Sequence, residues 1–305
     1  MVDTHLANLS NQLLLGTVLL YVVAMFGYAA DLAFVKKPAK VLVGAAGPSA
    51  SEEEQEEEGR DWGRFAILIN VIGWGMHLAA IVTRGLSVDR WPWGNMYEFM
   101  VAITFTAVSA YLVLLVRQKV RFLGAFVMVA VVIGLGIATI WLYKDAGALV
   151  PALKSYWIAI HVSAAIVASG GFTVSFVATA LYLLTARHES RGGESAFYDK
   201  LPKSLVFDRL SHRVIIFVFP IWTFAIIAGA IWADQAWGRY WGWDPKETWS
   251  FITFVVYAGY LHARATAGWK GQKAAIISLV GYGCLMFNLF GVNIFINGLH
   301  SYSGM

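Results

Sequence analysis

The chain has 305 residues, of which 58% are hydrophobic, 15% aromatic and only 14% charged. Soluble domains carry about 25% charged and about 45–50% apolar residues, so this chain lacks the polar side chains to cover a water-facing surface. The composition therefore excludes a soluble enzyme, a disordered chain and a collagen-like chain. Cys284 is the only cysteine, which excludes an internal disulfide and a thiolate zinc site.

Eight stretches are long and apolar enough to cross a bilayer, which requires roughly 20 mostly apolar residues. They lie at about 13–35, 65–83, 97–116, 122–143, 156–185, 214–232, 248–265 and 274–296. The bilayer interior offers no hydrogen-bond partners to bare backbone, so we expect every span to be a helix. The sequence thus predicts an all-α, polytopic integral membrane helix bundle of about eight transmembrane helices.

The placement of lysine and arginine predicts the orientation, because cytoplasmic loops carry an excess of both residues. If the N-terminus lies outside, seventeen of the 23 lysines and arginines fall on the cytoplasmic side and six on the outer side. We therefore expect both the N- and C-termini to be extracytoplasmic. The net charge of +4 is then a topology signal, and no nucleic-acid partner is expected.

The chain divides into three predicted parts. Residues 1–35 form the first transmembrane helix, residues 36–64 a cytoplasmic linker, and residues 65–305 a core of seven helices. The linker contains the acidic run Glu52–Glu58, whose like charges predict that it stays disordered.

The predicted outer loop at 232–249 is rich in aromatic residues. It holds Trp232, Trp237, Trp241, Trp243, Trp249 and Tyr240, six aromatic residues in eighteen. Tryptophan and tyrosine favour the lipid headgroup level, so an aromatic belt is one interpretation. A belt needs one or two such residues per helix end, whereas a cluster interleaved with Asp244, Lys246 and Glu247 favours a platform for a large planar ligand.

Four of the seven histidines lie inside predicted spans or at the outer face, where an ionisable side chain is a functional hypothesis by default. They are His77, His161, His262 and His300. His161 and His300 flank the tryptophan-rich loop from two sides. Imidazoles beside a planar aromatic wall are typical of a haem site. Zinc remains the alternative, with Asp244 completing a set of three ligands, but it leaves the tryptophans unexplained.

The segment WGRYWGWDPKETWSFITFVVYAGYLHAR, Trp237–Arg264, resembles the tryptophan-rich WWD motif of the haem-handling proteins of cytochrome c maturation. The particular resemblance is to the CcsA/ResC type of the system II cytochrome c synthase. Three further stretches are similar to that family: PWGNMYE at 92–98, KSYWIAIHV at 154–162 and GLHSY at 298–302. The resemblance covers about residues 65–305.

The resemblance implies haem b as the bound substrate, with His161 and His300 as axial ligands of its iron and as the catalytic residues. His262 resembles a membrane histidine that holds the haem iron on its way outward, and His77 matches a histidine of the family whose role is less defined. The other expected haem-binding residues are Trp237, Trp241, Trp243, Asp244 and Trp249. Asp244, Lys246 and Glu247 are candidates for contacts with haem propionates or peptide.

The implied function is transport of haem to the outer face and its covalent attachment to the CxxCH motif of apocytochrome c. This makes the chain one subunit of a holocytochrome c synthase. It lacks the large extracytoplasmic domain of the fused synthases, so a CcsB/ResB-type membrane protein is the expected partner, together with a thiol-reducing pathway. The expected location is the plasma membrane of a bacterium or a thylakoid-type membrane. Two alternatives stay open: a haem exporter or chaperone without ligation activity, and a b-type cytochrome subunit.

The charge asymmetry generates a topology prediction. Reporter fusions after residue 244 should be active on the extracytoplasmic side, and fusions after Lys200 only in the cytoplasm, because Lys200 belongs to the lysine- and arginine-rich side. A fusion after Lys200 that is active outside the cell would reverse the orientation.

Overall fold

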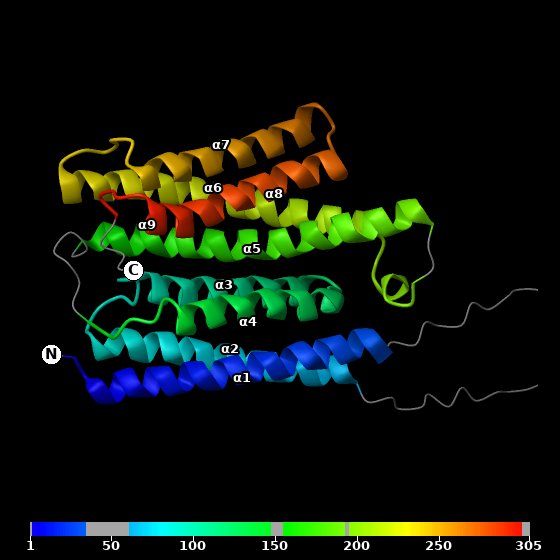
Figure 1. Ribbon diagram of the computed structural model, residues 1–305, viewed down its shortest axis with the longest axis horizontal. Coiled ribbons are helices and arrows are strands. Elements are labelled where there is room, and N and C mark those ends of the chain that lie inside the picture. The colour runs from blue at the N-terminus through cyan, green and yellow to red at the C-terminus, as the bar shows by residue number, and fades with distance from the viewer. Residues whose placement is uncertain (1, 35–60, 148–154, 193–194, 301–305) are drawn as a thin grey trace, which may run out of the picture.

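The computed structural model describes residues 2–34, 61–147, 155–192 and 195–300. The described chain is a bundle of eight long helices running side by side (Figure 1). Their bounds are α1 Thr4–Phe34, α2 Trp62–Ser87, α3 Met96–Arg117, α4 Gly124–Ile140, α5 Tyr156–Arg191, α6 Ser204–Trp237, α7 Pro245–Thr266 and α8 Gln272–Met286. A π-helical turn, Phe287–Gly291, and the short α9, Val292–Phe295, continue α8.

The predicted all-α membrane bundle is confirmed. Seven helices of the described chain are long and apolar enough to span a membrane, and the eighth, α7, runs alongside α8 (Figure 1). α7 is less apolar because it carries Lys246, Glu247, His262 and Arg264 together with two tyrosines. Residues 36–60 of the predicted linker 36–64 lie outside the described residues. Its last residues are described, and α2 begins among them at Trp62.

Two helices are longer than the sequence indicated. α5 has 36 residues, about 54 Å at 1.5 Å per residue, whereas a bilayer core is about 30 Å thick. α6 has 34 residues and begins at Ser204, ten residues before its apolar stretch. The polar first turns of α6 continue the helix because the Glu189 carboxylate of α5 accepts from the Ser204 N–H (2.9 Å). α5 extends past its neighbours at one end of the bundle (Figure 1).

The connecting segments alternate between the two ends of the bundle. Segments 88–95, 141–147, 238–244 and 296–300 gather at the end that we call the near end, on the left in Figure 1. Segments 118–120 and 267–271 lie at the opposite, far end, where α1 ends and α2 begins. This alternation matches the order of the predicted spans.

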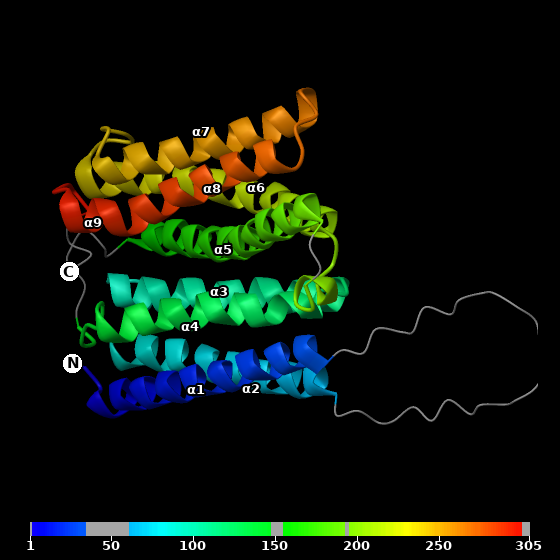
Figure 2. The ribbon, with the colours of Figure 1, turned by 45° about the vertical axis from the view of Figure 1, so that its right-hand side comes forward.

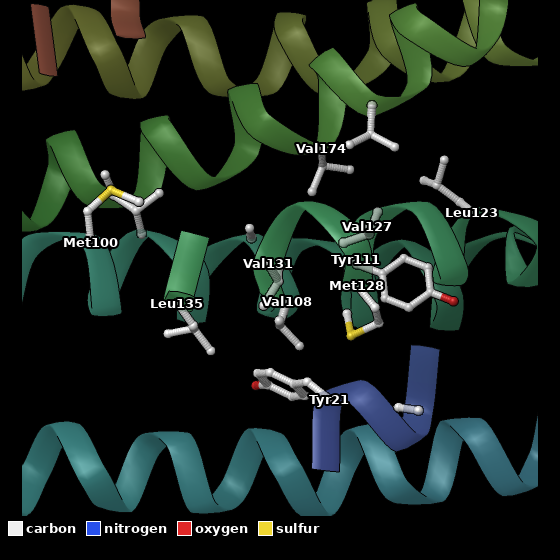
Figure 3. Packing of buried hydrophobic residues seen from close by; sticks show 14 of the residues in the cluster. Tyr21, Met100, Val108, Tyr111, Leu123, Val127, Met128, Val131, Leu135 and Val174 are labelled. Atoms are coloured by element: carbon white, nitrogen blue, oxygen red, sulfur yellow. The ribbon is translucent and has the colours of Figure 1, made fainter. Parts of the chain in front are cut away.

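The helices form two packed halves that share α5. α3 and α4 pack against one face of α5, with α1 and α2 behind them, and α6 and α8 pack against the other face, with α7 outside them (Figure 2). Figure 3 shows the first core, in which Tyr21, Val108 and Val131 of three different helices meet. A Cβ atom at Gly170 of α5 would lie 2.2 Å from Thr106 Oγ1 of α3, so only glycine permits this close approach.

A buried charged cluster holds the near end of the first half. Glu98 accepts from Arg84 (3.0 Å) and from Arg90 (2.8 Å), and its side chain is only 1% exposed. Arg90 also donates to the carbonyl of Gly147 (3.0 Å), while Glu98 accepts from the Gly94 N–H (2.8 Å). The cluster therefore fixes the loop 88–95 against the segment that follows α4.

We expect Glu98→Gln to lower the free energy of unfolding by about 3–5 kcal/mol, because it leaves two buried guanidinium groups without a counter-ion. Unfolding in mixed micelles titrated with dodecyl sulfate measures the change. The matched control is Asp61→Asn, which neutralises a carboxylate paired with the more exposed Arg64 and Arg121 and should cost about 0–1 kcal/mol. Equal losses for the two variants would contradict the prediction.

Candidate haem site

A cavity opens at the near end between α3, α5, α6, α7 and α8. It holds about 1180 Å³ of space free of protein atoms, including its opening. Its walls are mainly apolar and rich in aromatic rings, as is usual for sites that bind large organic ligands. The aromatic residues of the lining are Trp93, Phe99, Trp222, Trp232, Trp237, Tyr240 and Trp241.

His161 enters this cavity from α5. Its Nδ1 lies 2.8 Å from the carbonyl oxygen of Ala225 on α6, so Nδ1 donates and Nε2 carries the lone pair. The imidazole is stacked on the indole of Trp232, with ring centroids 6.0 Å apart and an interplanar angle of 9°. A Cβ atom at Gly229 would lie 2.7 Å from the imidazole, so this glycine makes room for the ring.

His300 reaches the same cavity from the segment that follows α9. Its Nδ1 lies 2.8 Å from Oδ2 of Asp244, which accepts the ring proton and again leaves the lone pair on Nε2. The backbone N–H of Leu299 donates to the other oxygen of the same carboxylate (2.7 Å). The imidazole contacts Trp232 at 5.8 Å and Trp237 at 5.1 Å between ring centroids.

The two histidines are thus brought together around one indole. Trp232 is 1% exposed and contacts both imidazoles. Histidines that bind metals almost always donate their other ring N–H to a carbonyl or a carboxylate, which sets the tautomer and the direction of the ring. His161 and His300 both have this arrangement, one with the Ala225 carbonyl and the other with the Asp244 carboxylate.

The loop before α7 is shaped by Glu247, which is buried. Its carboxylate accepts from the backbone N–H groups of Gly242 (2.8 Å) and Asp244 (3.0 Å) and pairs with Arg239 (3.1 Å). Asp244 and Glu247 also form a reciprocal capping box at the start of α7. Trp243, directly before Asp244, has a φ of 58°, a conformation uncommon outside glycine that persists only where surrounding contacts hold it.

Asp244 links this loop to the C-terminal segment and is 7% exposed. Burial acts to raise the pKa of its carboxyl group, but the hydrogen bonds from His300 and Leu299 outweigh burial and hold that pKa below its usual value. Asp244 therefore stays ionised at neutral pH and keeps its hydrogen bond with the imidazole of His300.

The structure divides the predicted tryptophans into two groups. Trp237 and Trp241 line the cavity. Trp243 is 65% exposed and contacts Trp241, but it does not line the cavity. Trp249 packs on Phe287, with ring centroids 4.2 Å apart. Trp93 and Trp222 also line the cavity but were not predicted as site residues. The sequence feature that could have identified Trp93 is its position in the PWGNMYE stretch at 92–98. Trp222 lies in an apolar span, and nothing in the sequence marks it as a site residue.

The other two predicted histidines lie away from the cavity. His77 of α2 is fully buried, with Tyr21 Oη 3.2 Å from its Nδ1 and Phe105 against its ring. His262 is exposed on the surface of α7, one turn before its far end. Neither lines the cavity that His161 and His300 share.

The zinc alternative requires three or four ligands in close array. In the part of the chain that the structure describes, no group of three histidine, cysteine or carboxylate side chains is arranged to hold a metal ion. Asp244 contacts the ring nitrogen of His300 instead and supports that histidine. Two imidazoles and an aromatic wall fit the axial coordination and the macrocycle of haem better than they fit zinc.

Comparison with known proteins identifies the family. Residues 93–300 match the family described as cytochrome C assembly protein. The chain is 38% identical over 231 residues to the cytochrome c biogenesis protein CcsA of Chlamydomonas reinhardtii, covering 73% of this chain and 64% of that protein. It is 34% identical to the CcsA of Guillardia theta, covering 76% and 85%, and 34% identical to that of Synechococcus elongatus, covering 75% and 86%.

Among solved structures, the chain is similar to the cytochrome c heme lyase CcmF, with a TM-score of 0.66 and 13% identity. The likeness covers 93% of this chain and 46% of CcmF. At this identity the likeness concerns the fold.

The Asp244 contacts generate a prediction for the C-terminal segment. A carboxylate with a lowered pKa stabilises the folded state at pH values above its unfolded value of about 3.9 and loses that effect as pH falls through the lower folded value. At pH 7 we therefore expect Asp244→Ala to speed amide hydrogen exchange at Leu299 by about tenfold or more, because a charge-assisted hydrogen bond is lost.

The control is Asp234→Ala, at the same end of the bundle, whose carboxylate makes no hydrogen bond to a described residue. It should leave exchange at Leu299 unchanged. Exchange that is equally slow in Asp244→Ala would mean that the carboxylate does not hold this segment.

Proposed function

Because the chain belongs to the cytochrome c assembly protein family, we propose that it transports haem b to the extracytoplasmic face and takes part in attaching it to apocytochrome c. Family membership makes it a multi-pass membrane protein of cytochrome c biogenesis. The finer steps below are our proposal, and we assign them to a bacterial plasma membrane or a thylakoid-type membrane.

One observation carries the proposal: two histidines meet at an aromatic cavity with the tautomer that metal coordination requires. His161 and His300 each donate from Nδ1 to a fixed acceptor, at 2.8 Å in both cases, and so direct Nε2 as the coordinating atom. We assign both as axial ligands of haem iron. Trp237 and Trp241 supply flat apolar surface for the macrocycle.

The reaction that follows is an addition. Each cysteine S–H of the CxxCH motif adds across one haem vinyl group, so that sulfur bonds to one vinyl carbon and hydrogen to the other. No oxidant or reductant is consumed in this step, although the thiols must arrive reduced, which is the task of a thiol-reducing pathway. The protein contributes positioning, because a reacting thiol must come within about 3–3.5 Å of its target.

The two imidazoles are held with different rigidity, which suits a transfer site. His161 belongs to a 36-residue helix, whereas His300 is held by the Asp244 contact and its aromatic neighbours. The histidine of CxxCH replaces one of them as the cytochrome folds around its haem. We propose a CcsB/ResB-type membrane protein as the partner that brings the apocytochrome to this site.

His262 and His77 keep the roles proposed from the sequence. His262, exposed on α7 toward the far end, is the proposed haem contact during transport, and its position on the bundle surface is accessible from the membrane or a partner. His77 packs inside α1 to α3, and we assign it no catalytic step.

The test is covalent haem attachment in cells that express the chain with its partner and a c-type cytochrome, scored by haem stain on a denaturing gel. His161→Ala and His300→Ala should each reduce the holocytochrome yield to background, and added imidazole should partly restore it by entering the open cavity. The control His188→Ala, which removes a ring stacked on Tyr198 at the far end, should have no effect.

Normal holocytochrome yield from either variant without imidazole would remove that histidine from the site. A purified wild-type protein without a Soret band, despite ample haem during expression, would contradict haem binding itself. Bound haem without covalent attachment in the complete system would instead favour a haem exporter or chaperone.

A further inference from the structure

The cavity has a polar corner, where α7 begins and α8 passes into a π-helical turn. Lys246 lies in the first turn of α7, and Asn288 lies in the π-helical turn Phe287–Gly291. Both line the cavity, and the ammonium group of Lys246 donates to the backbone carbonyl of Asn288 at 2.6 Å. This hydrogen bond therefore joins the first turn of α7 to the π-helical turn that follows α8.

Lys246 differs from the other cations held inside this bundle. Arg84 and Arg90 share Glu98, Arg239 pairs with Glu247, and Arg264 pairs with Asp208. Lys246 has no carboxylate within 4.0 Å among the described residues. The charge of Asp244 acts on it only from a longer distance, and the Asp244 carboxylate is already paired with His300. A cation that lines an apolar cavity with no carboxylate in direct contact is costly, and an anionic ligand lowers that cost.

Asn288 adds a second polar group with unused capacity. Its side chain is 8% exposed, and its Oδ1 is buried without a hydrogen-bond partner among the described residues. The NH₂ group of the same amide makes no hydrogen bond to them either, so it remains able to donate to a ligand. π-helical turns are rare and frequently lie at functional sites. Here the turn places a buried amide beside a lysine.

We propose that Lys246 and Asn288 form a carboxylate-binding subsite that orients the planar ligand, with its acidic edge toward α7 and α8. This deepens the proposed function and rests on it for the identity of the ligand, whose two propionates are the carboxylates concerned. Asp244 and Glu247 belong to the scaffold instead, since their oxygens already accept from His300, Arg239 and the loop backbone.

The proposal is tested by comparing two ligands, protohaem and its dimethyl ester, which has the same ring and vinyl groups but no free carboxylates. Each is titrated into purified protein in detergent at pH 7, and its dissociation constant is read from the Soret band. The wild type should bind protohaem about tenfold or more tightly than the ester, as expected for a hydrogen bond to a charged group.

Lys246→Met should abolish this preference and leave the affinity for the ester near that of the wild type. Asn288→Leu, which keeps the size of the side chain, should reduce the preference at least threefold. The matched control is Lys270→Met, the same substitution at an exposed lysine at the far end, and it should keep the full preference. Because the ratio of two affinities is measured in one protein, a general loss of stability does not mimic the result.

The outcomes separate the two proposals. Equal binding of protohaem and ester by the wild type would overturn the subsite while leaving haem binding intact. Full preference retained in Lys246→Met would likewise overturn it. If the wild type binds neither ligand, haem handling itself is wrong, and the subsite is wrong with it.

Discussion

The site depends on one carboxylate that joins three parts of the chain. Asp244 caps α7, accepts the backbone N–H of Leu299 and holds the ring of His300. Its pKa is lowered although it is buried, so these contacts together outweigh the cost of removing the charge from water. Without Asp244, one of the two proposed iron ligands would lose both its tautomer and its direction.

The helices could be predicted from the sequence because the bilayer leaves the backbone no alternative to the helix. Their ends were predicted less well, because the polar turns of α6 beyond the apolar stretch are stabilised by contacts with α5. The histidines of the site were found because an ionisable side chain is expensive at membrane depth and therefore noticeable. Which loop tryptophans line the cavity could not be predicted. The exposed position of Trp243 depends on its positive φ and on the hydrogen bonds that Glu247 accepts from the loop backbone. Asn288 could not be recognised as a site residue within its apolar stretch, because its position at the cavity depends on the π-helical turn that contains it.

The two halves of the bundle differ in what they contain: one holds the larger apolar core, and the other holds most of the candidate haem site. The half built by α1 to α4 has the larger apolar core and the buried Arg84–Glu98–Arg90 cluster, and it supplies only the rim of the cavity through Trp93 and its neighbours. The other half supplies His300 and the polar corner, and the shared α5 supplies His161. α5 belongs to both cores, and Gly170 lets it approach α3 closely. The fully buried His77 is a member of the first half and packs there with Tyr21 and Phe105.

The π-helical turn at Phe287–Gly291 also sets the rotational phase of everything after it. An α-helix advances by about 100° per residue, so the one residue by which such a turn exceeds an α-helical turn rotates the following segment by about that angle. α9 and the approach to His300 therefore face a direction that an uninterrupted α8 could not give them. A protein of this architecture that lost a single residue from the turn would have almost the same composition and hydropathy and the same number of spans. It would nevertheless present a different side of its last helix to the cavity.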